Sequence, residues 1–403
     1  MVRHDLVATY LARLPTGREE SAAEAFVVGQ SIGTWTPVPG ITPEMRDRHG
    51  GRIRSLVRLA PGNAVAGEPV GDGDTWLLEA AFPTVNFGPQ FPMLVTTLLG
   101  NDPSTSIAAR LVDIAVPNEF AAAFPGPQEG AAGWRRITGV STRPLVINMI
   151  KPCTGFPPAV GAGFVADSAR GGVDLIKDDE LLADPRFARV AERAAGYAAR
   201  LDEVAAETGH RARYVANVTT RSGAVVDTAR AAIEAGADAV MVNALAIGLD
   251  AVQMLAEARL GVPILAHTAG IETWTTGTAG AYGHRVLLAR LLRLAGADAI
   301  LTSTPHAPRP LERGRFEAVL DGARDGWMAL RPTMPMVGGG LTADHVQPIV
   351  EAAGFDVMIG VGGAIQGHPD GPVAGGRAVM AAVDAAVREA ADRPAGQPVA
   401  VPT

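Results

Sequence analysis

The stretch VDLIKDDE, residues 173–180, joins a short apolar run to four consecutive charged residues. Its aliphatic residues Val173, Leu175 and Ile176 are typical of a strand that is buried on both faces, as the strands of parallel sheets are. The charged residues follow at the point where such a strand ends. Because side chains alternate along a strand, Lys177 and Asp179 should point to one side and Asp178 to the other. The stretch therefore predicts a buried strand that delivers polar groups at its carboxyl end.

The pattern of an apolar run followed by a helix-like segment recurs from about residue 143 to the C-terminus. Strands are predicted at 145–150, 173–177, 214–218, 239–243, 263–266, 299–301, 335–337 and 357–360. Helices are predicted over roughly 183–208, 223–235, 247–260, 282–295, 311–324, 342–353 and 372–391. Eight alternations over about 260 residues favour a (β/α)8 TIM barrel. The alternative, a doubly wound sheet, more usually has five or six parallel strands.

The first 125 or so residues predict a different architecture. Strand-like runs at 6–11, 76–82, 93–99 and 111–116 accompany a helix near 19–28. Helices and strands mixed in this way indicate a small α+β domain of the ferredoxin-like class. We predict this domain over residues 1–125, a Pro/Gly-rich linker over 126–142, the catalytic barrel over 143–393 and a tail over 394–403.

Composition excludes several classes of function. A net charge of −7 and a pI near 5.7 argue against nucleic-acid binding, which needs a basic surface. No apolar run approaches the ~18 residues of a membrane span, and the N-terminus lacks the features of an export signal. The single cysteine, Cys153, excludes an internal disulfide and suits a reducing compartment. We therefore expect a cytoplasmic protein without nucleic-acid or membrane partners.

Only two of the 35 basic residues are lysines, Lys151 and Lys177. Both follow predicted strands, at the end where TIM barrels carry their active sites. A lysine amine can lose its proton and react, whereas an arginine guanidinium stays charged. A compositional bias against lysine explains the rarity but not the two positions. We therefore predict that both lysines are functional.

The acidic residues beside Lys177 predict a metal site. Asp179 and Glu180 offer the hard oxygen ligands that Mg²⁺ prefers. A protonated lysine would be repelled by that ion, so Lys177 must be neutral or chemically modified. The alternative interpretation is a solvated acidic loop without a ligand.

Two glycine clusters predict a phosphate site. VGGG (337–340) and VGGAIQGHPDG (361–371) follow the seventh and eighth strands, where barrels frequently hold phosphate on backbone N–H groups. Glycine permits the close backbone approach that such a site needs. Tight turns also use paired glycines and are the alternative.

Five motifs occur in the barrel region in a fixed order: IKP at 150–152, GGVDLIKDDE at 171–180, YVANVT at 214–219, GGG at 338–340 and GGAIQGHPDG at 362–371. In this order they resemble the RuBisCO large subunit, and QSIGTW (30–35) and LLGND (98–102) resemble its substrate-contacting segments. The resemblance implies a homodimer with active sites shared between subunits, possibly assembling further. It also implies that Lys177 is carbamylated by CO₂ and binds Mg²⁺ with Asp179 and Glu180.

Departures from that family are informative. The resemblance assigns one phosphate to Thr34, Trp35, Gly339, Gly340, Gly362 and Gly363. A second phosphate site is lost, because Thr268, Leu301 and Gly338 stand where the family has an arginine, a histidine and a serine. The closing-loop lysine has no counterpart in 304–311, and Cys153 and Gly29 replace a lysine and a glutamate. The chain is therefore most similar to the RuBisCO-like proteins (form IV), which do not fix CO₂.

The expected chemistry is the enolisation half of the family's reaction. Mg²⁺ would stabilise an enediolate, and either the Lys177 carbamate or Lys151 would move a proton. We expect a neutral Lys151, because burial beside a metal disfavours its charge. His267 would shuttle protons or hydrogen-bond a substrate hydroxyl, although a structural role is the alternative, and Asn101 would contact substrate. Cys153 is either an apolar filler or a reactive thiol.

The expected substrate is a monophosphorylated keto-sugar or keto-acid. From the resemblance we favour decarboxylation of a 3-oxo sugar-acid phosphate such as 3-oxo-isoapionate 4-phosphate, which leaves the enolate without removal of a proton. The alternative from the same family is the isomerase or enolase step on methylthioribulose-type phosphates in sulfur salvage. Two other classes stay open: a metal-free aldolase with a lysine Schiff base, and a non-catalytic sugar-phosphate-binding protein.

Overall fold

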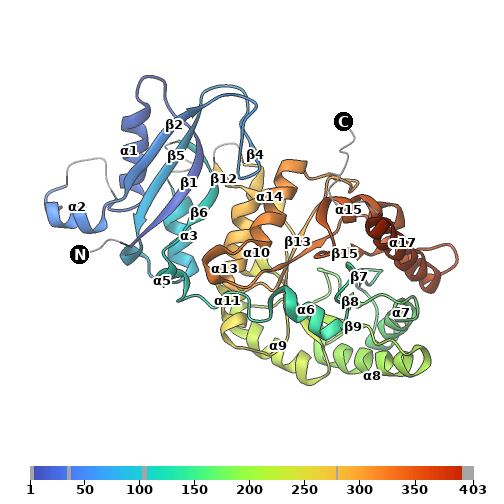
Figure 1. Cartoon of the computed structure of the whole chain (residues 1–403). Coiled ribbons are helices and arrows are strands. Elements are labelled where there is room, and N and C mark those ends of the chain that lie inside the picture. Colours follow the sequence, from blue (N-terminus) through green and yellow to red (C-terminus); the bar gives the residue numbers. More distant parts are fainter. Residues whose placement is uncertain (1–3, 34–37, 102–106, 278–279, 393–403) are drawn as a thin grey trace.

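The computed structural model describes residues 4–33, 38–101, 107–277 and 280–392. An N-terminal sheet with its helices lies beside a larger barrel (Figure 1). The predicted fold class is confirmed, because the barrel is closed from eight parallel strands and the N-terminal sheet is mixed.

The barrel strands follow one another around the barrel in chain order, and the last one pairs with the first. All eight predicted strands are present, with bounds within two residues of the predicted ones. They are β7 (Leu145–Met149), β8 (Leu175–Lys177), β9 (Arg213–Asn217), β10 (Ala239–Asn243), β11 (Ile264–His267), β13 (Ala299–Thr302), β14 (Met334–Val337) and β15 (Met358–Val361).

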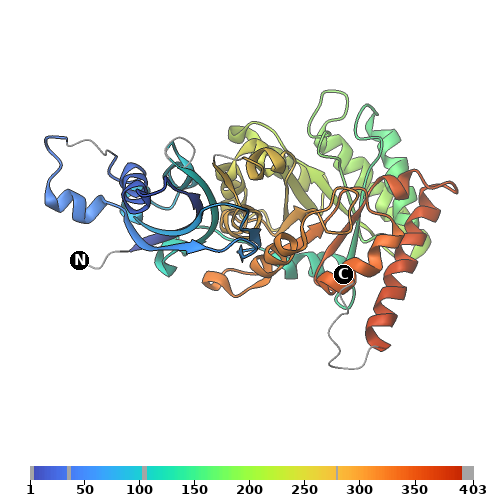
Figure 2. The same cartoon turned by 90° about the horizontal axis from the view of Figure 1, so that it is seen from above.

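Helices surround the barrel, as Figure 2 shows from above. They are α7 (Pro158–Arg170), α8 (Val190–Thr208), α9 (Val225–Glu234), α11 (Leu249–Glu257), a π-helical turn (Arg285–Leu291) continued by α13 (Leu292–Ala295), α14 (Arg313–Arg324), α15 (Val346–Ala353) and α17 (Pro372–Asp392). Short helices α10 (Ala244–Ile247), α12 (Ile271–Thr275) and α16 (Gly363–Gln366) lie in the loops. Helix α7 was not predicted. Two glycines and two valines lower the helix propensity that its alanines favour, and packing between α8 and α17 stabilises it.

The N-terminal end of the barrel is closed by helix α6 (Gly130–Thr138), which lies within the segment predicted as a linker. Its fully buried Trp134 packs against the first residues of several strands, including Leu145, Leu175 and Met334. Asp298 fixes the start of this helix, because its Oδ1 accepts hydrogen bonds from the N–H groups of Glu129 (2.8 Å) and Gly130 (2.5 Å). The interior is therefore filled at this end, which leaves the opposite end for a cavity.

The N-terminal domain is built from β1 (Asp5–Arg13), α1 (Glu19–Gly29), β2 (Arg52–Leu59), β5 (Thr75–Pro83), α3 (Phe91–Leu99) and β6 (Ala108–Ala115), with a small β3–β4 hairpin (Ala64–Val65 and Glu68–Pro69) and helices α2 (Pro43–His49) and α5 (Asn118–Ala121) at its edges. The sheet order β6-β1-β5-β2, with helix α1 between β1 and β2 and helix α3 between β5 and β6, is the ferredoxin-like arrangement. Tyr10 of β1 meets both helices. Its ring lies edge-on to Phe26 (5.3 Å) and its hydroxyl donates to the carbonyl of Leu98 (2.9 Å).

The strand predicted over 93–99 is wrong, because these residues form helix α3. The Gln90 side chain accepts a hydrogen bond from the Met93 N–H (3.1 Å), and Pro92 occupies the first turn, where proline is well tolerated. Leu94 and Leu98, spaced by one helical turn, are buried. Strand β2 was not predicted, since its alternating arginines obscure the apolar pattern of a half-exposed edge strand.

A short strand from the barrel part of the chain joins the N-terminal sheet. β12 (Gly280–Tyr282) lies between β11 and β13 in sequence, yet it pairs in parallel with β6. The N-terminal sheet therefore includes residues from both halves of the sequence.

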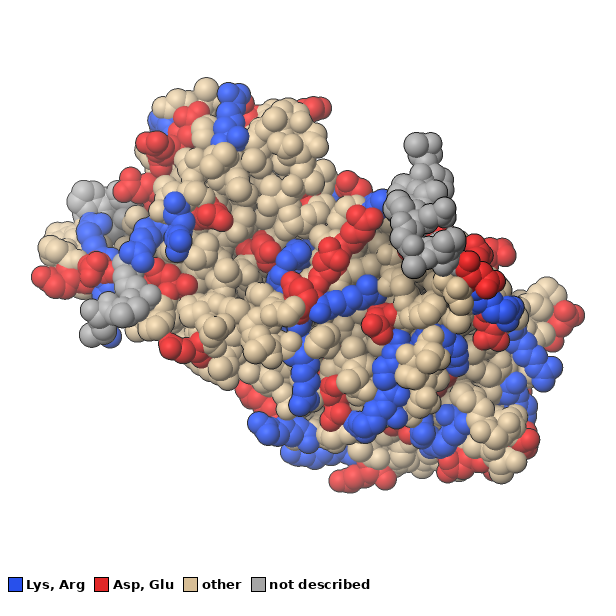
Figure 3. Space-filling view, viewed as in Figure 1, with Lys and Arg blue, Asp and Glu red and all other residues tan. Residues whose placement is uncertain are grey.

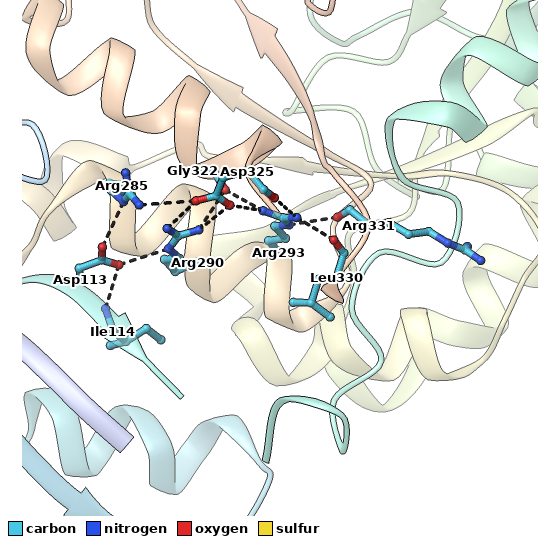
Figure 4. A network of polar contacts seen from close by, with 9 residues as sticks. All are labelled: Asp113, Ile114, Arg285, Arg290, Arg293, Gly322, Asp325, Leu330 and Arg331. Atoms are coloured by element: carbon cyan, nitrogen blue, oxygen red, sulfur yellow. Dashed lines mark hydrogen bonds and ion pairs between the residues drawn. The ribbon is translucent and has the colours of Figure 1, made fainter. Parts of the chain in front are cut away.

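Buried ion pairs join the two domains (Figure 4). Asp113 of β6 lies 3.2 Å from the Nε atoms of both Arg285 and Arg290. Asp325, directly after α14, contacts Arg290 (2.8 Å) and Arg293 (2.9 Å). Arg290 and Arg293 are almost completely buried, so these two carboxylates provide the negative charge that their burial requires.

Charged side chains of both signs share one face of the barrel. Figure 3 shows basic and acidic side chains interspersed over this face of the barrel, in keeping with the small net charge of −7. Within the described ranges, no helix has the length and apolar character that a membrane crossing requires.

We predict that Asp325→Asn lowers the free energy of unfolding by about 2–3 kcal/mol, because two buried guanidinium groups lose their shared negative charge. Urea unfolding followed by circular dichroism measures the change. The matched control is Asp227→Asn, whose exposed pair with Arg230 should be worth less than about 0.5 kcal/mol. Equal effects of the two variants would contradict the prediction.

Candidate active site

A cavity of about 590 Å³ opens at the carboxyl ends of the barrel strands. Nine of the predicted site residues line it: Lys151, Lys177, Asp179, Glu180, His267, Gly339, Gly340, Gly362 and Gly363. The structure thus brings together residues from the ends of five strands that are up to 212 positions apart in sequence. Met336, Leu341, Thr342 and Ala364 also line the cavity and were not predicted. The only sequence signal that could have identified them is their position within two residues of a glycine cluster.

Of the predicted N-terminal contacts, Asn101 lies among the described residues. Thr34 and Trp35 lie outside the described residues. Asn101 follows α3 of the N-terminal domain, and it is not among the described residues that line the cavity. Every residue of the cavity wall named above comes from the barrel.

Lys177 ends strand β8 and is almost completely buried, with 1% of its surface exposed. Its Nζ donates to the backbone carbonyl of Asp178 (2.8 Å). Burial lowers the pKa of Lys177 to about 8, even though Glu180 and Asp179 act in the opposite direction. The neutral form of this amine is therefore more accessible near neutral pH than that of an exposed lysine, although the protonated form predominates at pH 7.

Lys151 follows β7 and points its amine at the same site. Its Nζ donates to Asp179 Oδ2 at 2.5 Å and to Cys153 Sγ at 3.1 Å. Burial opposes the charge on Lys151, but these two hydrogen bonds outweigh it and raise the pKa. In this arrangement Asp179 stabilises the ammonium form of Lys151, whereas the expectation of a neutral amine concerns the metal-bound site and stays a prediction.

Asp179 and Glu180 differ in exposure and in partners. Asp179 is buried; its Oδ1 accepts from the Leu181 N–H (3.1 Å), and its contacts with Lys151 and Leu181 lower its pKa against the effect of burial. The Glu180 side chain is 35% exposed and lies 3.7 Å from Nε2 of His267. Two carboxylates therefore border the cavity from one strand end.

His267, the last residue of β11, is held as a neutral donor. Burial, followed by the positive charge of Lys177, lowers the pKa of His267 to about 3. The Ala269 N–H donates to His267 Nδ1 (3.2 Å), which leaves the ring proton on Nε2. That N–H faces Glu180 at the cavity. His267 is therefore suited to donate a hydrogen bond to an oxygen atom.

Asparagine side chains hold the backbone of the acidic segment from the adjacent strands. Asn217 Nδ2 donates to the carbonyls of Asp179 (3.1 Å) and Glu180 (3.3 Å). Asn243 Nδ2 donates to the carbonyl of Glu180 at 2.9 Å. The position of Glu180 is thus fixed through its backbone while its carboxylate stays free to reach a ligand.

The glycine clusters form another part of the wall. Gly339 (φ +106°) and Gly340 (φ +79°) adopt left-handed backbone conformations that disfavour other residues, and a Cβ on Gly340 would lie only 3.1 Å from Pro308. Gly362 and Gly363 follow β15 and lead into α16. Backbone N–H groups at two neighbouring strand ends are suited to hold an anion.

A second cavity of about 540 Å³ shares His267, Leu301 and the 338–340 glycines with the first. Its wall includes Thr268, whose hydroxyl donates to the carbonyl of Leu301 (2.9 Å). Arg309, an exposed residue of the 304–311 loop, also lines it. The position at which the resemblance expects a second phosphate is therefore lined mainly by neutral side chains.

The residues present fit a divalent ion only if Lys177 contributes. Among the described parts of the chain, no three His, Cys, Asp or Glu side chains gather closely enough to hold a metal ion. Asp179 and Glu180 could offer two oxygen ligands beside the buried Lys177, whose pKa is lowered to about 8. A carbamate on that amine would supply a third oxygen ligand and remove the positive charge.

Comparisons with known proteins agree with this geometry. Residues 130–314 and 317–398 match the family "Ribulose bisphosphate carboxylase large chain, catalytic domain". A ribulose bisphosphate carboxylase-like protein from Archaeoglobus fulgidus is 36% identical over 385 residues, covering 95% of this chain and 88% of that protein. A 2,3-diketo-5-methylthiopentyl-1-phosphate enolase from Geobacillus kaustophilus is 35% identical over 384 residues, covering 94% and 92%.

Solved structures show the same likeness over nearly the whole chain. A RuBisCO-like protein from Alicyclobacillus acidocaldarius superimposes with a TM-score of 0.85 at 33% identity, covering 96% of this chain and 94% of that one. A dimeric archaeal RuBisCO from Hyperthermus butylicus gives a TM-score of 0.84 at 26% identity, covering 96% and 92%. The chain therefore belongs to the RuBisCO large-chain family, and its relatives include the RuBisCO-like proteins.

Proposed function

We propose that the chain is a Mg²⁺-dependent enzyme that converts a monophosphorylated diketone or keto-sugar into its enol and does not fix CO₂. The observation that carries this proposal is the convergence of Lys151, Lys177, Asp179, Glu180 and His267 on one cavity beside two glycine clusters. Relatives named as enolases support the enolisation alternative over the decarboxylation that we favoured from the sequence. We therefore take a 1-phosphorylated 2,3-diketone as the substrate to test first.

The proposed ligands are Asp179, Glu180 and a carbamate on Lys177. Mg²⁺ bound by them would polarise the substrate carbonyl and stabilise the negative charge of the enolate. The neutral amine of Lys177 is the form that adds CO₂, with loss of one proton. Its burial and lowered pKa support this modification.

Lys151 is the residue to which we assign proton transfer at the substrate carbon. Its amine borders the cavity and is held by Asp179. Once Asp179 serves as a metal ligand, the strongest stabilisation of the ammonium form is removed, and burial then favours the neutral amine. Lys151 Nζ can therefore accept the proton in the active complex.

His267 and the glycine clusters orient the substrate in this proposal. The Nε2–H of His267 would donate a hydrogen bond to a substrate oxygen, rather than act as a base, because its pKa is about 3. Backbone N–H groups of Gly339, Gly340, Gly362 and Gly363 would hold the phosphate. The mainly neutral wall of the second cavity supports a substrate with one phosphate and an uncharged distal end.

We further propose a homodimer with shared active sites. The predicted contacts Thr34, Trp35 and Asn101 belong to the N-terminal domain, whereas the described cavity wall comes from the barrel. A second copy of the chain would bring these contacts to the cavity. One of the solved relatives is named as dimeric, which supports this arrangement.

We predict that the wild-type protein, with Mg²⁺ and bicarbonate, enolises 2,3-diketo-5-methylthiopentyl 1-phosphate, as followed by ultraviolet absorbance and by deuterium incorporation in D₂O. Glu180→Gln and Lys177→Arg should lower kcat/KM by about a thousandfold or more, because each removes a proposed metal ligand. Asp227→Asn, remote and exposed, serves as the control. Release of CO₂ from a 3-oxo sugar-acid phosphate, without this enolisation, would support decarboxylation instead.

The same assay separates the other classes of function. Activity that survives EDTA and is destroyed by borohydride in the presence of substrate would indicate a Schiff-base aldolase. Binding of a sugar phosphate without exchange, CO₂ release or turnover would indicate a non-catalytic binding protein. Either result would contradict the proposed enolisation.

A pH dependence follows from the pKa of Lys177. The amine is protonated below pH 8 and neutral above it, so incorporation of ¹³CO₂ at fixed dissolved CO₂ should rise through about pH 8 and then level off. The carbamate carbon signal in NMR measures it, and Lys177→Arg should show none, since its guanidinium stays protonated. Uptake that falls as the pH rises from 7 to 9 would be the opposite of this expectation.

Shared sites predict complementation between inactive variants. Lys177→Met removes the barrel half of a site and Asn101→Ala weakens the N-terminal half. Co-expressed at equal levels, random dimers should regain about a quarter of the wild-type activity, because half of the dimers carry one intact site. Activity no higher than that of the separate variants would argue for sites contained within single chains.

A further inference from the structure

Asp178 is the one acidic residue of the 178–180 run that points away from the cavity. As strand alternation requires, it faces the helix layer, where both it and Arg193 of α8 are completely buried. We propose that Asp178 and Arg193 are positioning residues that hold the segment 177–180 in the geometry needed for metal binding. This inference rests on the proposed metal site and adds residues that do not touch the metal.

Three donors converge on one oxygen of Asp178. Its Oδ2 accepts from Arg193 Nη2 (2.9 Å), from the Tyr214 hydroxyl (2.7 Å) and from the backbone N–H of Asn217 (3.0 Å). These donors come from helix α8 and strand β9, both of which are rigid elements of the barrel. Tyr214 is itself fixed by Tyr197, whose ring lies edge-on at 4.9 Å. The orientation of Asp178 is therefore set from two neighbouring elements.

Arg193 also fixes the loop that follows the ligands. Its guanidinium donates to the carbonyls of Ala183 (2.6 Å) and Leu182 (3.4 Å) and also to that of Ala188. Residues 181–189 form no helix or strand, so these bonds replace the backbone pairing that regular structure would supply. One side chain thereby joins Asp178 to both ends of the loop.

Asn217 links this buried cluster to the ligands themselves. Its backbone N–H binds Asp178, while its side-chain amide binds the carbonyls of Asp179 and Glu180. Consecutive residues of a strand are joined by planar peptide units, so fixing Asp178 on one face fixes its neighbours on the other. The backbone that carries the ligand carboxylates is consequently fixed before an ion arrives.

Stability alone does not account for a charged pair at this place. Removing two charges from water is costly, and well-packed apolar residues often stabilise a fold equally well. The contribution of the Asp178–Arg193 pair is to orient the ligand segment. Residues behind a metal site fix the orientation of its ligands, and their substitution typically weakens metal binding 10- to 100-fold.

The test compares metal affinity with stability. We expect Arg193→Lys, which keeps the charge but loses the fork of donors, to raise the Kd for Mg²⁺ about 10- to 100-fold in isothermal titration calorimetry with bicarbonate. Tyr214→Phe, which removes one hydroxyl, should raise it about fivefold and is the variant more certain to fold. Arg200→Gln removes an exposed arginine from the same helix, and its Kd should equal that of the wild type.

Thermal unfolding of the metal-free proteins completes the experiment. A lower Tm with an unchanged Kd in Tyr214→Phe would mean a purely structural role and would overturn the inference. Absence of Mg²⁺ binding by the wild type would overturn both this inference and the proposed function. Metal binding by the wild type that weakens in both variants supports the inference, even if no diketone phosphate is turned over and the proposed function alone fails.

Discussion

The alternation of side chains at the end of one strand, β8, determines which residues face the cavity and which face the helix layer. At the end of β8, Lys177 and Asp179 face the cavity, whereas Asp178 faces the helix layer. The two sides differ in their surroundings. On the inner side, burial lowers the pKa of a lysine that has acidic neighbours; on the outer side, an arginine, a tyrosine and a backbone amide surround a carboxylate. A shift of the strand by one residue would exchange these roles and abolish the site.

The two ends of the barrel have opposite characters for a related reason. Trp134 and the apolar first residues of the strands fill the amino end, so polar side chains there would lack partners. At the carboxyl end, the strands stop before the interior is filled, and lysine, carboxylate, imidazole and glycine backbone meet around open space. Rigidity at one end therefore supports an accurately placed set of groups at the other.

Much of this organisation could be predicted from the sequence. The eight buried strands are recognisable in the sequence as short apolar runs. The residues at or just after their carboxyl ends, such as Lys151, Lys177 and His267, meet because the parallel strands end at one edge of the barrel. Helices α3 and α7 could not be assigned in this way, since their stability comes from packing and capping rather than from a clear period. The protonation of Lys151 could not be derived from the sequence alone, because it depends on a 2.5 Å contact with Asp179 that spacing does not reveal. Arg193 could not be linked to the site at all, because only the fold places it behind Asp178.

Strand β12, which comes from the barrel part of the chain, completes the N-terminal sheet and makes that sheet depend on the barrel. β12 covers the outer edge of β6, and its backbone satisfies hydrogen-bonding groups that would otherwise face solvent. A fragment that stops before the barrel would expose that edge and offer it to any other extended chain. The N-terminal domain could therefore not be shuffled as an independent module without a substitute for three residues encoded some 170 positions later.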